Sequence, residues 1–172
     1  MTRTTLLPSE YHNFYQIYID QVDPALGIVE GLKTQHLTIL NFYKQLPEDK
    51  HNYAYVKDKW TIKDVLLHII DTERILAYRA LRISRGDKTA LSGFEQDDFV
   101  VHGKANERSM ESLCAEYSAV RQASIALFSS FDDAANLRVG EASGFPISVR
   151  ALGFIILGHE NHHNRIIEER YL

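Results

Sequence analysis

The sequence has few of the features that cross-link a chain or anchor it in a membrane. Its single cysteine, Cys114, excludes a disulfide within the chain and is typical of a reducing cytosol. No apolar run approaches the roughly 20 residues that a membrane-spanning helix needs. The first eight residues are too polar for a secretory signal, so we expect a cytoplasmic protein that does not enter a membrane.

The sequence also has no large excess of positive or negative charge. The formal net charge is −4 and 24% of the residues are charged, so we expect no general attraction to nucleic acid or to anionic membranes. Apolar residues make up 45%, which is ordinary for a soluble globular protein. There are no repeats or low-complexity tracts. We therefore predict a single domain over residues 1–172, long enough to bury a sizeable core.

Long amphipathic segments dominate what is present, and strand signals are few. Apolar residues recur with the helical period of about 100° per residue in four parts of the chain. This pattern predicts an all-α protein, a four-helix bundle with long connectors. The predicted helices cover residues 24–46, 61–84, 109–130 and 148–168.

The remaining segments are an arm and two connectors. Residues 1–22 are rich in tyrosine and form an N-terminal arm, either a short helix or an extended segment laid across the bundle. The connector 86–107 is long for a loop, and it either covers one end of the core or acts as a spacer. The connector 131–147 contains glycine and proline and is expected to include a brief extended stretch.

Local signals predict where helices begin. Asp23 followed by Pro24 matches an N-cap with proline at the first helical position. Thr61 and Asp64 match a capping box. Ser148 is in position to cap the last helix.

Three of the eight histidines fall within the five residues from His159 to His163. At about 100° per residue, His159 and His163 share the apolar face of the last predicted helix, one turn apart. Two imidazoles at this spacing can hold one metal ion from the same side, and burying them without partners is costly. The alternative is a pair of buried histidines, each satisfied by a hydrogen bond. His162 lies near the edge of the stripe and is the weaker candidate.

The same five residues match the H-E-x-x-H pattern of zinc metalloproteases, in which the glutamate is the general base. The longer form of that pattern fails at Ile166, and no strand edge is evident to hold a peptide. A di-iron carboxylate bundle needs Glu-x-x-His on two helices. Glu160 with His163 supplies one such pair, but Glu48 with His51 falls in a predicted loop. We therefore favour neither class.

A third kind of metal site, after the protease and di-iron patterns, is a set of three imidazoles from two helices. It adds His68 to His159 and His163. His68 lies about 100° from the centre of the apolar stripe of its helix, so periodicity alone predicts a surface or boundary histidine. Asp71 and Glu73 on that helix can orient an imidazole or remain solvated charges. Three histidines leave a fourth coordination position open, as in catalytic zinc sites. Zinc, nickel, iron and manganese all fit nitrogen ligands.

Four segments carry a resemblance to a known family: Trp60 to Arg74, Tyr78-Arg79, Gly93 to Phe99 with Asn106, and His159-x-x-His162-His163. They resemble the DinB-like family of metal-binding bundles, and the likeness covers nearly the whole chain from residue 24 onward. The resemblance implies a four-helix bundle with a three-histidine site for a divalent metal, in which His68, His159 and His163 are the ligands, and it implies a homodimer. Family members include thiol-dependent S-transferases and isomerases, and others are described as metal-dependent hydrolases.

Three functions follow as hypotheses. The first is a thiol-dependent S-transferase, in which a low-molecular-weight thiol becomes a thiolate on the metal and attacks a small electrophilic substrate. The second is a hydrolase that activates water with the same metal. The third is a non-catalytic metal-binding or assembly module. A fourth protein ligand would support the third hypothesis, and a cleft above an open coordination position would argue against it.

The nucleophile is expected to come from outside the chain. Cys114 lies within a predicted helix, where a lone cysteine is more typical of packing than of catalysis. Glu160 lies about 100° round its helix from His159, so its spacing does not place it as a base for water. Both observations favour the thiol over the hydrolase.

Overall fold

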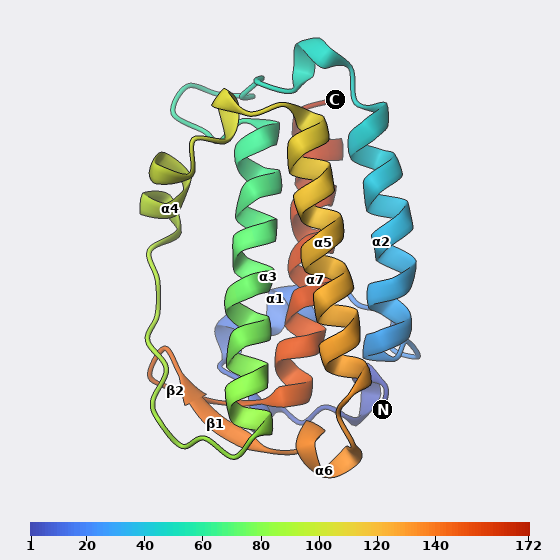
Figure 1. Cartoon of the computed structure of the whole chain (residues 1–172), viewed down its shortest axis with the longest axis vertical. Coiled ribbons are helices and arrows are strands. Elements are labelled where there is room, and N and C mark those ends of the chain that lie inside the picture. The colour runs from blue at the N-terminus through green and yellow to red at the C-terminus, as the bar shows by residue number, and fades with distance from the viewer.

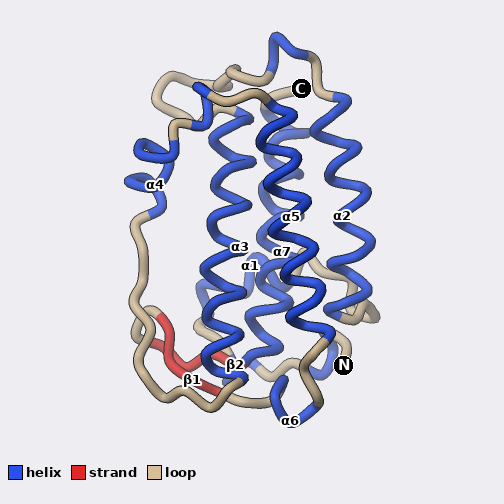
Figure 2. The backbone as a smooth tube through the Cα atoms, in the orientation of Figure 1, coloured by secondary structure: helices blue, strands red, loops and turns tan.

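Four long helices form a bundle in the computed structural model, which describes residues 1–172 (Figure 1). Short elements lie around the bundle, and the only strands are the two of one hairpin (Figure 2). No helix combines the length and the apolar character that crossing a membrane requires. The predicted all-α four-helix bundle is confirmed. Its helices are α2 (Ile28–Gln45), α3 (Ile62–Ser84), α5 (Met110–Ser129) and α7 (Val149–Arg170).

The directions of the four helices differ from those of a simple up-and-down bundle. In Figure 1, α2 and α7 run from the lower end to the upper end, whereas α3 and α5 both run downward. Because α3 and α5 are parallel, the segment that joins them must return along α3, whose 23 residues span about 34 Å. This is why the connector 86–107 is long. It carries α4 (Gln96–Gly103), which packs beside α3.

Side-chain caps fix the starts of three long helices. The Thr61 hydroxyl accepts from the main-chain N–H of Asp64, and the Asp64 carboxylate accepts from the N–H of Thr61, so the predicted capping box is confirmed. Ser148 caps α7 as predicted. Ser109 caps α5 in the same way.

The first long helix begins later than predicted. The Asp23-Pro24 pair indicates a start at residue 24, but α2 begins at Ile28. The Asp23 carboxylate instead accepts from the N–H of Ala25 and closes a separate turn. Gly27 is then extended and pairs with the N-terminal arm, so the chain cannot be helical before it.

The connector 131–147 contains the predicted extended stretch, which is part of a hairpin. Strands β1 (Val139–Ala142) and β2 (Phe145–Ser148) pair antiparallel. Ser143 and Gly144 join them, both with positive φ, as a tight two-residue hairpin turn requires. Leu91 of the longer connector forms a bridge to Ala142, which ties that connector to the hairpin. The short helix α6 (Asp133–Asn136) precedes the strands.

The N-terminal arm contains 3₁₀ turns and one short helix, α1 (Gln16–Ile19), which packs against α7. The two main chains approach closely at Gly158, where a Cβ atom would overlap the carbonyl group of Tyr18. A glycine is therefore required for α1 to lie against α7. Through this contact the arm reaches the middle of α7.

The interior has two apolar clusters with a polar layer between them. One cluster lies toward the lower end and includes Leu32, Leu76 and Leu152, and the other lies toward the upper end and includes Leu66 and Leu113. Between them, each of the four long helices contributes polar side chains at the same level. These are Gln35 of α2, His68 and Glu73 of α3, Arg121 of α5, and His159 and Glu160 of α7.

Candidate metal centre

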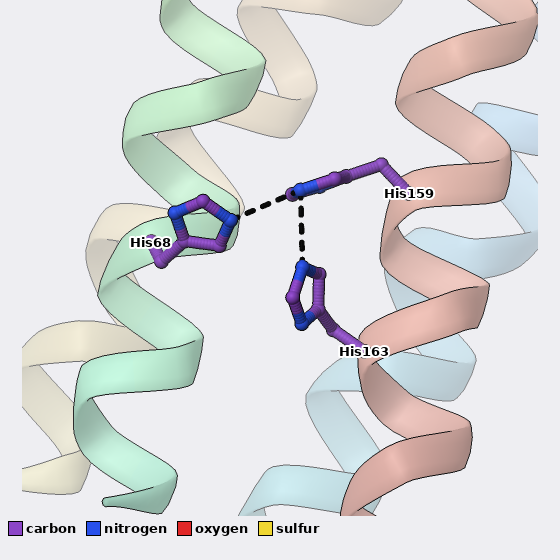
Figure 3. A group of neighbouring side chains, drawn as sticks. All are labelled: His68, His159 and His163. Atoms are coloured by element: carbon purple, nitrogen blue, oxygen red, sulfur yellow. Dashed lines mark hydrogen bonds between the residues drawn. The ribbon is translucent and has the colours of Figure 1, made fainter. Parts of the chain in front are cut away.

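Three imidazoles meet within this polar layer (Figure 3). The Nε2 atom of His159 lies 3.0 Å from Nε2 of His68 and 3.1 Å from Nε2 of His163. His68 comes from α3, and His159 and His163 lie one turn apart on α7. The structure thus brings together the two histidines that their spacing on one helix indicated and the third that the family resemblance implied. His162 is not in the group.

His68 is buried, which corrects the boundary position that periodicity predicts. Its exposed fraction is 5%. The five residues from Leu66 to Ile70 are all buried, because α3 is covered by α7, α5 and the connector that carries α4. A helix that is packed on several sides has no single buried stripe, so an angular position does not decide burial there.

The three nitrogens cannot satisfy one another through hydrogen bonds alone. A neutral imidazole nitrogen either donates one hydrogen or accepts through one lone pair. Nε2 of His159 nevertheless faces two other Nε2 atoms at hydrogen-bonding distance. A cation that accepts all three lone pairs resolves this conflict, and three neutral imidazoles are a common ligand set for zinc and related metals. The donor set therefore fits a metal ion.

Burial keeps the three side chains neutral. Desolvation lowers the pKa of His68 to about 4 and is the main reason that the pKa of His163 falls to about 3. The pKa of His159 lies well below its ordinary value, first because of burial and then because of the neighbouring histidines. Neutral imidazole is the form that binds metals, so at neutral pH protons compete little for this site.

Aromatic rings hold the histidines in place. The ring of Trp60, just before α3, lies 4.8 Å from that of His68 between centroids. The edge of Tyr18, from the arm, packs on His159 at 5.2 Å. Trp60 and the N-terminal arm thus each pack directly on an imidazole of the centre.

Two hollows adjoin the centre from different sides. His68 and His159 line a cavity of about 370 Å³, with walls from the arm, α3, α7 and the segment 93–96. His163 lines a more open groove of about 710 Å³, together with Trp60 and Tyr171. Gln96 lines both. The connector 86–107 thus covers the metal centre rather than acting as a simple spacer.

The nearby carboxylates are engaged elsewhere. Glu73 and Glu160 both bind Arg121, and Asp71 binds Arg74. None of these carboxylates is hydrogen-bonded to the three imidazoles. Asp71 and Glu73 therefore do not orient a histidine, which was one of the two predicted roles. Glu160 is not placed as a base, in agreement with its spacing.

Cys114 does not take part in the centre. It is buried among the apolar residues of the upper cluster, and burial raises the pKa of its thiol. Its predicted packing role is consistent with this position.

Sequence reasoning overlooked Thr72 and Arg79, which line the cavity beside His68. Both lie on α3 and fall within about 40° of His68 at 100° per residue. The helical spacing that places both residues on the same face as His68 was the available signal. It was hidden because only the apolar positions were used to orient the helix.

The fold and the site together define a helical bundle with a three-imidazole centre beside a cavity of small-molecule size. The chain belongs to the DinB superfamily, whose model matches residues 33–167 and so includes all three histidines. No curated protein matches the chain by sequence.

The fold is also similar to that of YfiT from Bacillus subtilis, which is described as a probable metal-dependent hydrolase with an unusual four-helix bundle topology. The TM-score is 0.71 at 14% sequence identity, over 96% of this chain and 90% of YfiT. At this identity the likeness shows the fold alone.

Proposed function

We propose that the protein is a metal-dependent enzyme for small molecules, in which His68, His159 and His163 hold one divalent ion. The observation that carries this proposal is the convergence of three neutral Nε2 atoms, which cannot all be satisfied by hydrogen bonds to one another and which together match the ligand set of a divalent cation. Zinc, nickel, iron and manganese are all candidates for such a ligand set. A bound divalent ion would lower the pKa of a thiol or water and so supply a nucleophile at neutral pH.

The cavity argues for catalysis over a purely structural site. The group contains three protein ligands and no fourth, which is the pattern of catalytic rather than structural zinc sites. Two of the three histidines also line the 370 Å³ cavity, so a substrate can reach the centre. The chain's own part is to fix the imidazoles, exclude bulk water with aromatic rings and orient the substrate.

A thiol-dependent S-transferase is the reaction that we favour. No carboxylate is held at the centre to accept a proton from a metal-bound water, because Glu73, Glu160 and Asp71 are bound to arginines instead. Two hollows that meet at one centre also suit a reaction with two substrates. In this reaction the thiol loses its proton, its sulfur forms a bond to an electrophilic carbon, and the leaving group departs with the electron pair.

A hydrolase is the second candidate. It is favoured by the fold shared with YfiT, which is itself described as a probable metal-dependent hydrolase. Glu95 also lines the cavity and is exposed, so it is the one carboxylate free to assist a water molecule.

Metal analysis of matched variants tests the site. We expect purified protein to carry about one divalent ion per chain, and His159→Ala or His163→Ala to lose it because each removes one of only three ligands. His162→Ala is the control, since it is the neighbouring histidine on the same helix and lies outside the group. Unchanged metal content in His159→Ala and His163→Ala would disprove the proposed centre.

Activity assays then separate the reactions. The metal-loaded protein should join low-molecular-weight thiols to electrophiles, and Cys114→Ala should retain this activity while His159→Ala loses it. Turnover of esters or amides without any thiol, abolished by a chelator, would instead establish the hydrolase.

A further inference from the structure

Arg79 on α3 is a buried cation without an acidic partner. It is 2% exposed, and none of the ion pairs in the protein includes it. Its Nη2 donates to the main-chain carbonyl of Ser92 at 2.7 Å and to the hydroxyl of Ser143 at 3.1 Å. Nε and Nη1 have no partner in the chain. Arginine is seldom buried unless its charge is paired, so a missing partner is indicated.

The unpaired groups face the cavity beside the metal centre. Arg79 lines this cavity, and so does Thr72, whose buried hydroxyl oxygen also lacks a hydrogen-bond partner. Both share one face of α3 with His68, as the helical period requires. The cavity therefore has two imidazoles at one place on its wall, and the Arg79 cation and the unpaired Thr72 hydroxyl farther along α3.

The other residues that line the cavity indicate the chemistry of its ligand. Phe14, Tyr15, Tyr18 and Phe94 give the cavity an aromatic lining. Glu95 is the one acidic side chain that lines it, and this residue is exposed and makes no ion pair with Arg79. A pocket with an aromatic wall and a single buried cation suits a molecule with an apolar body and one anionic group.

We propose that this cavity binds a small organic anion, whose carboxylate or phosphate group accepts hydrogen bonds from Arg79 and Thr72. Its apolar body lies against the aromatic rings. The other end of the ligand lies near His68 and His159, and we assign it as the reacting group. This assignment rests on the proposed function, whereas the anion site is independent of it. Arg79 is then a residue that selects the substrate by charge.

Arg79 also has a structural role, because its contacts to Ser92 and Ser143 tie the long connector to the hairpin. A variant of Arg79 loses these contacts together with any ligand. The decisive comparison therefore uses the unaltered protein and two ligands of the same shape, 3-phenylpropanoate and its neutral amide, with phenyl phosphate as the phosphate counterpart.

Calorimetric titration measures these affinities in the zinc-loaded protein and again after chelation. We expect the carboxylate or the phosphate to bind, and the amide to bind roughly tenfold to hundredfold more weakly, because a charge-assisted hydrogen bond is lost. Arg79→Gln should remove this preference. Arg82→Gln is the matched control, since Arg82 lies on the same helix but is paired with Asp87. Arg79→Lys, which retains the charge, should keep a preference for the acid, and it thus separates loss of charge from loss of the contacts to Ser92 and Ser143.

Equal affinity for acid and amide would overturn the proposal, and so would the absence of anion binding at millimolar concentration. Anion binding that disappears on chelation and in His159→Ala, but survives in Arg79→Gln, would place the anion on the metal and also overturn it. The two proposals fail separately: a chain without metal can still prefer the acid, and a chain with metal can fail to do so.

Discussion

At the scale of single residues, the least expected feature is the charge network beside the metal centre. The guanidinium of Arg121 is fully buried and binds the carboxylates of Glu73, at 2.8 Å, and Glu160, at 2.7 Å. Gln35 accepts a further hydrogen bond from Arg121, and Tyr117 donates to Glu160 at 2.7 Å. One cation thus joins α3, α5 and α7 and contacts α2. Burial raises the pKa of Glu160 although Arg121 opposes this effect.

The network leads to a prediction for stability. Arg121→Met should lower the free energy of unfolding by about 3–5 kcal/mol, because it leaves two buried carboxylates without their cation. Glu160→Gln should cost clearly less, since it removes one of two negative charges and keeps a similar shape. Urea denaturation at pH 7 measures both. A smaller loss for Arg121→Met than for Glu160→Gln would contradict the assignment of Arg121 as the central partner.

The candidate site was predictable in part, and the reason lies in its residues. His159 and His163 are one turn apart on one helix, so their convergence follows from local geometry. His68 lies on another helix, and only the family resemblance nominated it. Thr72 and Arg79 share one face of α3 with His68, but no local pattern describes how that face meets the connector.

At the scale of elements, local signals were sufficient where a cap or a long amphipathic pattern exists. The starts of α3 and α7 follow from Thr61 and Ser148, whose side chains bind the first turns. The start of α2 does not, because the pairing of Gly27 with the arm overrides the Asp23-Pro24 signal. α1, α4 and the hairpin are too short to have a strong period of their own and depend on contacts with the bundle.

The contact of α1 with α7 leads to a prediction for one glycine. Gly158→Ala should displace α1, because the added methyl group would overlap the main chain of Tyr18, which cannot rotate away as a side chain can. We expect a loss of about 1–3 kcal/mol in the free energy of unfolding, as is usual when a packed interior receives extra volume. Hydrogen exchange of residues 16–19 should also become faster.

The matched control for this prediction is Gly27→Ala. A Cβ atom there would meet its nearest neighbour at 3.6 Å, an ordinary contact. Equal effects of the two substitutions would show that the close approach at Gly158 does not hold α1 in place.

At the scale of the whole molecule, the topology explains why the metal centre has a cover. Parallel α3 and α5 force a connector along the outside of the bundle, and this connector supplies Phe94 and Gln96 to the hollows beside the histidines (Figure 1). The sequence predicted four helices but not their directions, because each amphipathic pattern specifies a buried face and not its partner. The parallel pair is a property of the assembled bundle.

The stability of the whole molecule should depend on pH through the three histidines of the centre. In the folded, metal-free protein the pKa is about 4 for His68 and about 3 for His163, against an ordinary value of 6.5. At pH values between 6.5 and these lowered pKa values, the unfolded chain binds more protons than the folded one. The free energy of unfolding therefore decreases as the pH falls below 6.5. Each fully shifted histidine contributes a loss of about 1.4 kcal/mol per pH unit.

A divalent metal should oppose this loss, because it binds the neutral imidazoles of the folded protein. At a free concentration a hundred times its dissociation constant it adds about 2.7 kcal/mol to the free energy of unfolding. Urea denaturation at pH 7.5 and pH 5.5, with and without zinc, measures both effects. The loss on acidification should be smaller in His163→Ala than in the unaltered protein, whereas substitution of the exposed His102 should leave it unchanged. An equal loss in His163→Ala and the unaltered protein would mean that these imidazoles do not control the acid sensitivity of the fold.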